Sequence, residues 1–187
     1  MANFEIAYKI TGGHEGGWVN NPTDRGQETA FGISRKYYPT WNGWLIIDRH
    51  KRLPDFPNNL KENKALEEQT FSFYKKNFWD VNKLDQLISQ EIANEAYDTG
   101  VNMGYRVAAE FIQRSYNLLS KNGSAYSRIS VDGDVGPKTI KAVNEHPRPD
   151  RIAKTMNILQ GAKYVSICEK DPTQEVFFSG WLERVGI

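Results

Sequence analysis

Four residues near the N-terminus carry side chains suited to acid–base chemistry: Glu15, Asp24, Glu28 and Thr29. Glu15 stands where a predicted first helix gives way to a turn-rich segment. A carboxylic acid at such a junction can be partly buried and held protonated, as the general acid of a glycosidase requires. A second carboxylate on the following loop, Asp24, can face it across a cleft and activate water or stabilise positive charge at the anomeric carbon. Glu28 is a reserve for that role, and Thr29 is placed to position water.

Plainer interpretations of these two carboxylates stand beside the catalytic one. Glu15 could be an exposed carboxylate at a helix end, because charged side chains mostly face solvent. Asp24 lies in a turn rich in Asn and Pro, where its carboxylate could bond to its own backbone as an Asx-turn. The residues alone leave both alternatives open.

Polar and aromatic residues farther along the chain are candidates for holding a substrate. Asp98 and Asn102 lie four residues apart on one predicted helix, so they share a face and can line a cleft together with Tyr97. Bonding to a neighbouring helix is the alternative, because buried polar groups need partners. Trp18 and Trp79 are candidate platforms for a sugar ring, and each could instead fill a core.

Several other kinds of site lack their required residues. The pair His14-Glu15 begins a metalloprotease-like HExxH pattern, but position 18 is Trp, so the second histidine ligand is missing. The chain has three His and one Cys, which gives little basis for a zinc site and no intrachain disulfide. Neither a GxSxG nucleophile elbow nor a phosphate-binding P-loop occurs. We therefore expect neither a metal nor an organic cofactor.

The elements that must position these residues are mostly helical. Asn3 is a predicted N-cap for a first helix that ends by Gly16-Gly17, and residues 18–33 carry turn and strand signals that predict a small hairpin. Residues 34–60, with Pro39, Pro54 and Pro57, look irregular. Helical periodicity covers the segments 62–78, 89–104, 107–119, 137–144, 152–167 and 177–185. These patterns predict a mainly α fold with a small β-hairpin or loop after the first helix.

Composition and charge narrow the class of protein. The chain has 24 Lys and Arg against 23 Asp and Glu, a formal net charge of +1, which argues against a surface that tracks nucleic-acid phosphates. The N-terminus has neither the basic nor the apolar region of a signal peptide, and no stretch is apolar enough for membrane insertion. We expect a protein made in the cytoplasm, whose delivery to any outside substrate depends on another system. Its oligomeric state is left open.

The run from Glu15 to Ser34, EGGWVNNPTDRGQETAFGIS, resembles the signature of glycoside hydrolase family 108, the bacterial and phage N-acetylmuramidases once labelled secretion activator proteins. That signature has EGG, an aromatic residue, V-N, D-x-G-G-x-T and a closing G-I. Gln27 replaces its second loop glycine. The segments 97–104 and 180–185 also resemble family motifs, Trp79-Asp80 matches an aromatic-Asp step, and residues 131–139 resemble the peptidoglycan-binding region that accompanies these enzymes.

The resemblance implies a lysozyme-like fold and a peptidoglycan hydrolase that cleaves the β-1,4 bond between N-acetylmuramic acid and N-acetylglucosamine. It makes Glu15 the catalytic acid and peptidoglycan glycan strands the binding partner. The spacing of Glu15, Asp24 and Thr29 also resembles the Glu-Asp-Thr triad of phage-type lysozymes, one residue shorter between the last two, which implies Asp24 and Thr29 as its partners. The alternatives are a lytic transglycosylase and a non-catalytic, wall-binding secretion accessory protein. Action on the wall would follow release by a holin or a secretion system.

The same resemblance suggests two regions, a catalytic one over residues 1–90 and a peptidoglycan-binding one over residues 91–187. The periodicity qualifies this division. Ile92, Ala96, Tyr97 and Val101 form an apolar face that needs a partner from elsewhere in the chain. We therefore expect the two regions to share one core.

Overall fold

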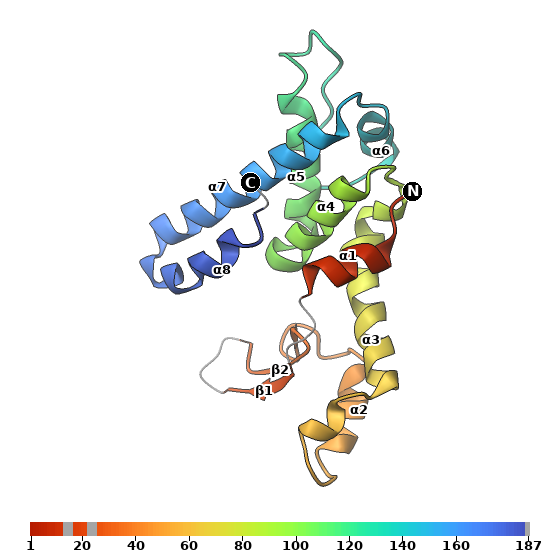
Figure 1. Ribbon diagram of the computed structural model, residues 1–187, viewed down its shortest axis with the longest axis vertical. Coiled ribbons are helices and arrows are strands. Elements are labelled where there is room, and N and C mark those ends of the chain that lie inside the picture. Colours follow the sequence, from red (N-terminus) through yellow and green to blue (C-terminus); the bar gives the residue numbers. More distant parts are fainter. Residues whose placement is uncertain (13–16, 22–25, 186–187) are drawn as a thin grey trace. The chain divides into compact units, whose positions relative to one another are not determined.

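A computed structural model of the chain describes residues 1–12, 17–21 and 26–185. The chain divides into two compact units, whose elements are labelled in Figure 1. Unit 1 comprises residues 1–11 and 78–187, and unit 2 comprises residues 12–77. Unit 1 is therefore built from both ends of the sequence.

Unit 1 is a helical bundle with α4 at its centre. Its α-helices are α1 (Phe4–Thr11), α4 (Gln90–Met103), α5 (Tyr105–Leu118), α6 (Pro137–Asn144), α7 (Pro149–Lys170) and α8 (Phe178–Leu182). Short 3₁₀ turns lie at Asp80–Asn82, Leu84–Gln86 and Pro172–Phe177. Helix α4 packs against α1, α5 and α7, so the apolar face predicted on residues 92–101 has three helical partners.

Local signals account for where the helices of unit 1 begin and end. The Asn3 side chain accepts a hydrogen bond from the backbone N–H of Glu5 at 2.7 Å, and Ser89 Oγ accepts one from Ile92 at 3.3 Å. Both are N-caps, as predicted. Gly104, at φ 97°, separates α4 from α5. Pro137 occupies the start of α6, where its missing N–H costs nothing.

The core of unit 1 joins residues from both predicted regions. The Phe4 ring lies 5.5 Å from the Trp79 ring and 5.4 Å from the Tyr97 ring, measured between centroids. Trp79 and Tyr97 are fully buried, each with 0% of its surface exposed. The first helix is therefore an integral part of the bundle formed by the C-terminal helices.

Unit 2 combines a three-stranded antiparallel sheet with two helices. The strands β1 (Trp18–Asn20), β2 (Glu28–Ala30) and β3 (Ile33–Ser34) pair in that order, with Val19 opposite Thr29 and Thr29 opposite Ser34. The helices are α2 (Gly43–His50) and α3 (Lys64–Tyr74), with a 3₁₀ turn at Asn58–Leu60 between them and a π-turn at Lys75–Trp79 after α3. The mainly α fold with one small β element is confirmed.

One sequence prediction for the elements needs correction. The first helix ends at Thr11, within the limit predicted at Gly16-Gly17, and Gly12 follows it in a left-handed conformation at φ 59°. Residues 34–60 are not irregular throughout, since they contain α2. Pro39 and Pro54 lie outside this helix and leave the 14 residues between them free to form it. No described helix is long and apolar enough to cross a membrane.

Candidate functional site

The two predicted catalytic carboxylates, Glu15 and Asp24, lie outside the described residues. The structure describes the elements on either side of them. Helix α1 ends four residues before Glu15, and strands β1 and β2 stand before and after the loop that contains Asp24. The hairpin is therefore the scaffold on which this loop is carried.

Thr29, the third predicted catalytic residue, is the middle residue of β2. Its partners across the sheet are Val19 on one side and Ser34 on the other. A Cβ atom on Gly26 would stand only 3.2 Å from Thr29 Oγ1, so the backbone at Gly26 passes close to this hydroxyl. Ser34 Oγ also donates a hydrogen bond to the Gly26 carbonyl at 2.8 Å. The described end of the loop is therefore held beside Thr29.

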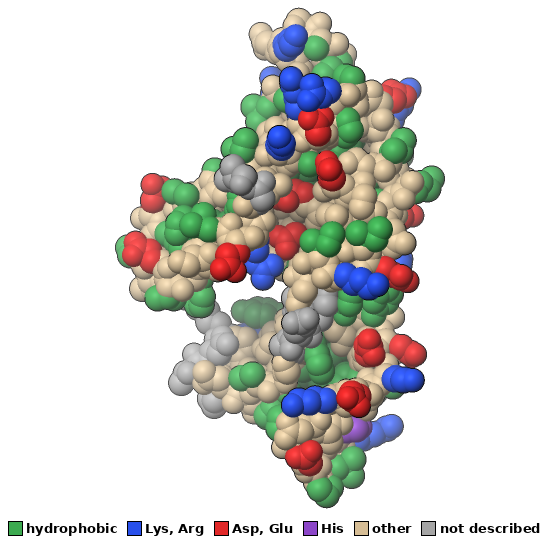
Figure 2. Space-filling model, in the orientation of Figure 1, with side chains coloured by type: hydrophobic (Ala, Val, Ile, Leu, Met, Phe, Trp, Pro, Cys, Tyr) green, Lys and Arg blue, Asp and Glu red, His purple; other side chains and the backbone are tan. Residues whose placement is uncertain are grey.

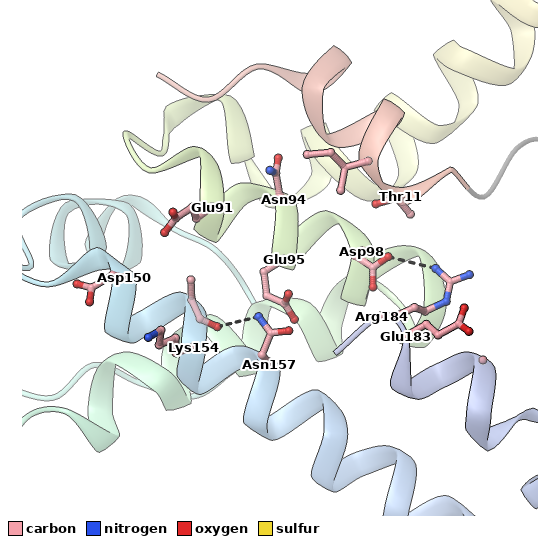
Figure 3. Close-up of a pocket in the computed structure, with 13 residues that line it drawn as sticks. Thr11, Glu91, Asn94, Glu95, Asp98, Asp150, Lys154, Asn157, Glu183 and Arg184 are labelled. Atoms are coloured by element: carbon pink, nitrogen blue, oxygen red, sulfur yellow. Dashed lines mark hydrogen bonds and ion pairs between the residues drawn. The ribbon is translucent and has the colours of Figure 1, made fainter. Parts of the chain in front are cut away.

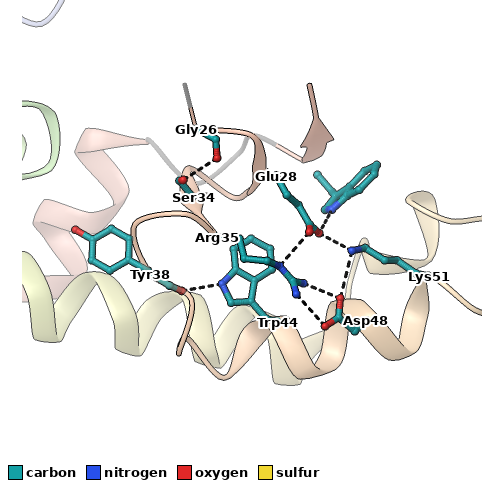
Figure 4. A network of polar contacts seen from close by, with 9 residues as sticks. Gly26, Glu28, Ser34, Arg35, Tyr38, Trp44, Asp48 and Lys51 are labelled. Atoms are coloured by element: carbon teal, nitrogen blue, oxygen red, sulfur yellow. Dashed lines mark hydrogen bonds and ion pairs between the residues drawn. The ribbon is translucent and has the colours of Figure 1, made fainter. Parts of the chain in front are cut away.

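Glu28, the reserve candidate, is fully occupied by partners from three elements (Figure 4). Its carboxylate accepts a hydrogen bond from Trp18 Nε1 at 2.8 Å and forms ion pairs with Arg35 Nε at 3.0 Å and Lys51 Nζ at 2.7 Å. The Glu28 side chain is only 13% exposed. The arrangement ties the hairpin to the end of α2.

Asp48 extends this network from α2. Arg35 donates two hydrogen bonds to the Asp48 carboxylate, at 3.0 and 2.6 Å, and Lys51 Nζ lies 3.2 Å from Asp48 Oδ1. The bonds from Arg35 lower the pKa of Asp48 below its ordinary value, and the same pairing raises the pKa of Arg35. The Arg35 guanidinium also lies 4.4 Å from the centre of the Trp44 ring, a cation–π contact that orients it.

The three aromatic candidates have different surroundings. Trp18 is half-buried in β1, with its ring edge-to-face against Phe56 at 4.6 Å and Lys51 Nζ 5.7 Å from the ring centre. Part of its surface remains open to a ligand. Trp79 and Tyr97, by contrast, are enclosed in the core of unit 1 and present no surface on which a sugar could stack. The alternative stated above, that a Trp fills a core, describes Trp79.

A cavity of about 720 Å³ opens in unit 1 between α4, α7 and the end of α8 (Figure 3). Asp98 lies on its wall and accepts hydrogen bonds from Gln160 Nε2 at 2.9 Å and from Arg184 Nη1 at 3.3 Å. Asn102 Nδ2 instead donates to the Asp98 carbonyl at 2.8 Å. The pair predicted on one helix face thus splits: Asp98 lines the cavity and bonds to α7, whereas Asn102 is not among the residues that line it.

Glu95 stands one helical turn before Asp98 on the same wall. Burial is the main reason that the pKa of Glu95 rises to about 7, and the nearby negative charge of Asp98 raises it further. Hydrogen bonds from Thr99, at 3.5 Å, and from Asn157 oppose the shift. Among the described residues, no cation forms an ion pair with Glu95. This carboxyl group can exchange a proton near neutral pH.

Comparison with known families now bears on these observations. The family model described as glycosyl hydrolase 108 matches residues 8–104, a little over half of the chain. This chain belongs to the glycosyl hydrolase 108 family. A second model, described as a predicted peptidoglycan domain, matches residues 107–186 of this glycosyl hydrolase 108 protein. The two matches together support a peptidoglycan-related glycosidase that acts on the cell wall.

One solved structure shares the fold of this glycosyl hydrolase 108 protein over nearly its whole length. It is the structure of Brucella abortus SagA, with a TM-score of 0.59 and 23% sequence identity, and the match covers 97% of this chain and 88% of that one. At that identity the similarity concerns the fold. No curated protein matches the chain.

Several polar residues that the structure places in the two units were not predicted from the sequence. Glu95 is three residues from Asp98, so helical spacing could have placed it on the same wall. Arg184 belongs to the C-terminal motif GWLERV at residues 180–185, which gave no role for it. Arg35, Asp48 and Lys51 gave no signal, because they lie in a segment expected to be irregular. Within the described part of the chain, no group of three or more His, Cys, Asp or Glu could hold a metal ion.

Proposed function

We propose that this glycosyl hydrolase 108 protein is an N-acetylmuramidase that hydrolyses the β-1,4 bond between N-acetylmuramic acid and N-acetylglucosamine. The observation that carries the proposal is the family match over residues 8–104, which includes the whole run from Glu15 to Ser34. The paired strands β1 and β2, which bracket the Asp24 loop, support it. Action at the wall would follow release from the cytoplasm by a holin or a secretion system.

In this mechanism Glu15 donates a proton to the glycosidic oxygen as the bond to the anomeric carbon breaks. Positive charge develops at that carbon, and Asp24 takes a proton from a water that attacks it. Carboxylates separated by about 6.5–9.5 Å leave room for such a water and invert the configuration, whereas a separation near 5 Å gives direct attack and retention. We favour inversion because Asp24 is carried on a loop with a turn at Gly26. Thr29 positions the water.

The network around Glu28 supports giving the second role to Asp24. A general base must accept a proton from water during the reaction. Glu28 already accepts hydrogen bonds or ion pairs from Trp18, Arg35 and Lys51, all at 3.0 Å or less. These contacts engage both carboxylate oxygens of Glu28. We therefore assign to Glu28 the role of orienting the hairpin, and to Asp24 the second catalytic role.

The central test is the Glu15→Gln variant on purified peptidoglycan. Gln has nearly the same shape as Glu but cannot protonate the leaving oxygen, so cleavage should fall by about 10²–10⁴-fold. Glu5→Gln on the exposed side of α1 is the matched control and should keep its activity. Turnover by Glu15→Gln above a tenth of the wild-type rate, with an unchanged melting profile, would remove Glu15 from this role.

Product analysis separates the proposal from its rivals. Mass spectrometry should show reducing N-acetylmuramic acid ends. Anhydromuramic ends would instead identify a lytic transglycosylase, and binding to the wall without any product would identify an accessory protein. In the same assay Asp24→Asn should lose about 10²-fold in rate, and NMR of fresh product should show the inverted anomer. Near-normal activity of Asp24→Asn would assign the base elsewhere.

A further inference from the structure

A second cavity, of about 490 Å³, lies in unit 1. Its lining residues are far along the sequence from the catalytic motif at residues 15–34. It is formed by the C-terminal end of α5, the loop after it, the end of α6 and the start of α7 (Figure 1). All of its lining residues fall between 116 and 151, inside the region that matches the predicted peptidoglycan domain. Thr29, the proposed catalytic residue that the structure describes, is not among the residues that line this cavity.

Three rings form one wall of this cavity and hold each other in place. The Tyr116 and Tyr126 rings lie 4.5 Å apart, and the His146 ring stands edge-to-face against Tyr126 at 5.2 Å. His146 Nδ1 accepts a hydrogen bond from the Arg148 backbone N–H at 3.1 Å, so the ring proton of neutral His146 sits on Nε2. Nε2 then donates to Tyr126 Oη at 3.0 Å, and Tyr126 donates to the Tyr116 carbonyl at 2.9 Å. The wall is rigid and partly apolar.

Cations dominate the charged groups around these rings. Lys121 and Arg151 both line the cavity and are exposed, and in the part of the chain that the structure describes neither forms an ion pair. Arg148 is already paired with Asp150 at 2.8 Å. Glu145, the acidic residue on the lining, lies 3.9 Å from Lys141. Figure 2 shows Lys and Arg side chains gathered at the end of unit 1 that carries the loop after α5.

The loop that carries Lys121 is held in an uncommon conformation. Lys121 and Asn122 have φ angles of 52° and 57°, in the left-handed region that non-glycine residues seldom adopt. Ser120 Oγ accepts a hydrogen bond from the Gly123 N–H at 3.2 Å, and Ser124 Oγ donates one to the Lys121 carbonyl at 2.8 Å. Backbone strain of this kind persists where surrounding contacts fix it. These contacts fix the backbone from which the Lys121 side chain extends at the cavity.

From this geometry we propose that the cavity is a non-catalytic binding site for the peptide stem of peptidoglycan, in which Lys121 and Arg151 bind stem carboxylates beside the aromatic wall. Cations without an ion-pair partner among the described residues can bind a carboxylate, and tyrosine rings pack well against a sugar ring or a small side chain. In a glycan strand that carries its stems, the lactyl carboxyl of N-acetylmuramic acid is joined to the stem by an amide bond, so the free carboxylates lie on the stem. The proposal rests on peptidoglycan being the ligand of this protein, and it is independent of whether Glu15 cleaves it.

The test measures binding of a soluble muramyl peptide, N-acetylmuramyl-L-alanyl-D-isoglutamine, which contains no glycosidic bond to cleave. Titration into the ¹⁵N-labelled full chain should shift NMR signals of residues 120–126 and 145–151. Arg151→Gln combined with Lys121→Gln should weaken binding at least about tenfold, as expected for the loss of charge-assisted hydrogen bonds. The single variant Arg151→Gln should fall between this pair and the wild type.

Matched controls separate a built site from general charge. Lys138→Gln combined with Lys163→Gln removes the same two charges from exposed positions elsewhere in unit 1 and should leave binding unchanged. N-acetylglucosamine and inorganic phosphate, at equal ionic strength, should bind at least about tenfold more weakly than the muramyl peptide. Equal losses in both double variants, equal binding of phosphate, or no localised shift would each overturn the proposal. If the wild-type chain released no product from peptidoglycan, the proposed function would fail while this affinity stood.

Discussion

Two glutamates in different units show how far surroundings decide the role of one residue type. Glu28 in unit 2 is paired with two cations and an indole N–H, all at 3.0 Å or less. Glu95 in unit 1 lines a cavity, has another carboxylate as its main charged neighbour, and has its pKa raised to about 7. The first joins elements together through its ion pairs and hydrogen bond. The second is destabilised as an anion and holds its proton close to neutral pH.

The comparison shows which carboxylates can do chemistry. A carboxylate whose oxygens are all engaged contributes to stability, and its removal should reduce folding more than turnover. A carboxyl group that lines a cavity and forms no ion pair contributes little to stability when ionised and remains open to a ligand. A single isosteric substitution, Glu28→Gln or Glu95→Gln, tests each of these two roles.

A large loss of stability is expected for Glu28→Gln. The amide keeps an acceptor for Trp18 but loses both ion pairs, and two partly buried cations are left uncompensated. We expect a loss of about 2 kcal/mol in the free energy of unfolding, measured by denaturant titration. Asp48→Asn removes a more exposed carboxylate of the same network, 44% exposed, and should cost less than about 1 kcal/mol.

The Glu28 variant also separates structure from catalysis. Well below its melting temperature, folded Glu28→Gln protein should retain most of its rate on peptidoglycan, because the proposed acid and base are both intact. A rate loss of about 10²-fold with normal stability would instead make Glu28 the second catalytic carboxylate.

Glu95→Gln should act in the opposite direction. Folding raises the pKa of Glu95 from 4.5 to about 7, so between those values the folded chain binds a proton that the unfolded chain releases. The resulting stability is fully present below pH 4.5 and is lost as the pH rises through 7. Since Gln cannot ionise, the variant should match the wild type near pH 4 and exceed it by about 1–3 kcal/mol at pH 8.

Thermal or denaturant unfolding at the two pH values measures this difference. Glu91→Gln is the control, because Glu91 lines the same cavity but is exposed, and it should show no dependence of its effect on pH. An effect of Glu95→Gln that is equal at pH 4 and pH 8 would mean that Glu95 ionises normally in the folded chain.

The boundaries of most helices in unit 1 follow from local signals, and this explains why they could be predicted. Ser89, Gly104 and Pro137 act through their own backbone and their nearest neighbours, so the sequence shows their effect directly. Helical spacing, which is also a local signal, identified Asp98 as a candidate residue. The environment of Glu95 could not be predicted in this way, since Asn157, which bonds to it, comes from α7, 62 residues later.

In unit 2, local sequence signals do not predict the polar network around Glu28. Its network joins β1, β2, the segment after β3 and α2, and pairing across such separations depends on the completed fold rather than on any short pattern. Trp79 illustrates the same point, because nothing near it in sequence distinguishes a buried Trp from a sugar platform. Its burial follows from contact with Phe4, 75 residues earlier.

The smallest expected effect concerns Gln27, the residue directly before Glu28. The family signature has Gly at this position, and here Gln27 has φ 54°, a left-handed conformation in which a Cβ atom is strained. Gln27→Gly should relieve this strain by about 1–2 kcal/mol and lose part of the gain to the greater freedom of the unfolded chain. The expected net gain is about 0.5–1 kcal/mol in denaturant titration.

Gln27→Ala keeps the Cβ atom and should give no gain. If both variants were equally destabilising, the Gln27 side chain rather than its backbone would be what fixes this part of the hairpin, and the Glu28 network would need a fourth contributor.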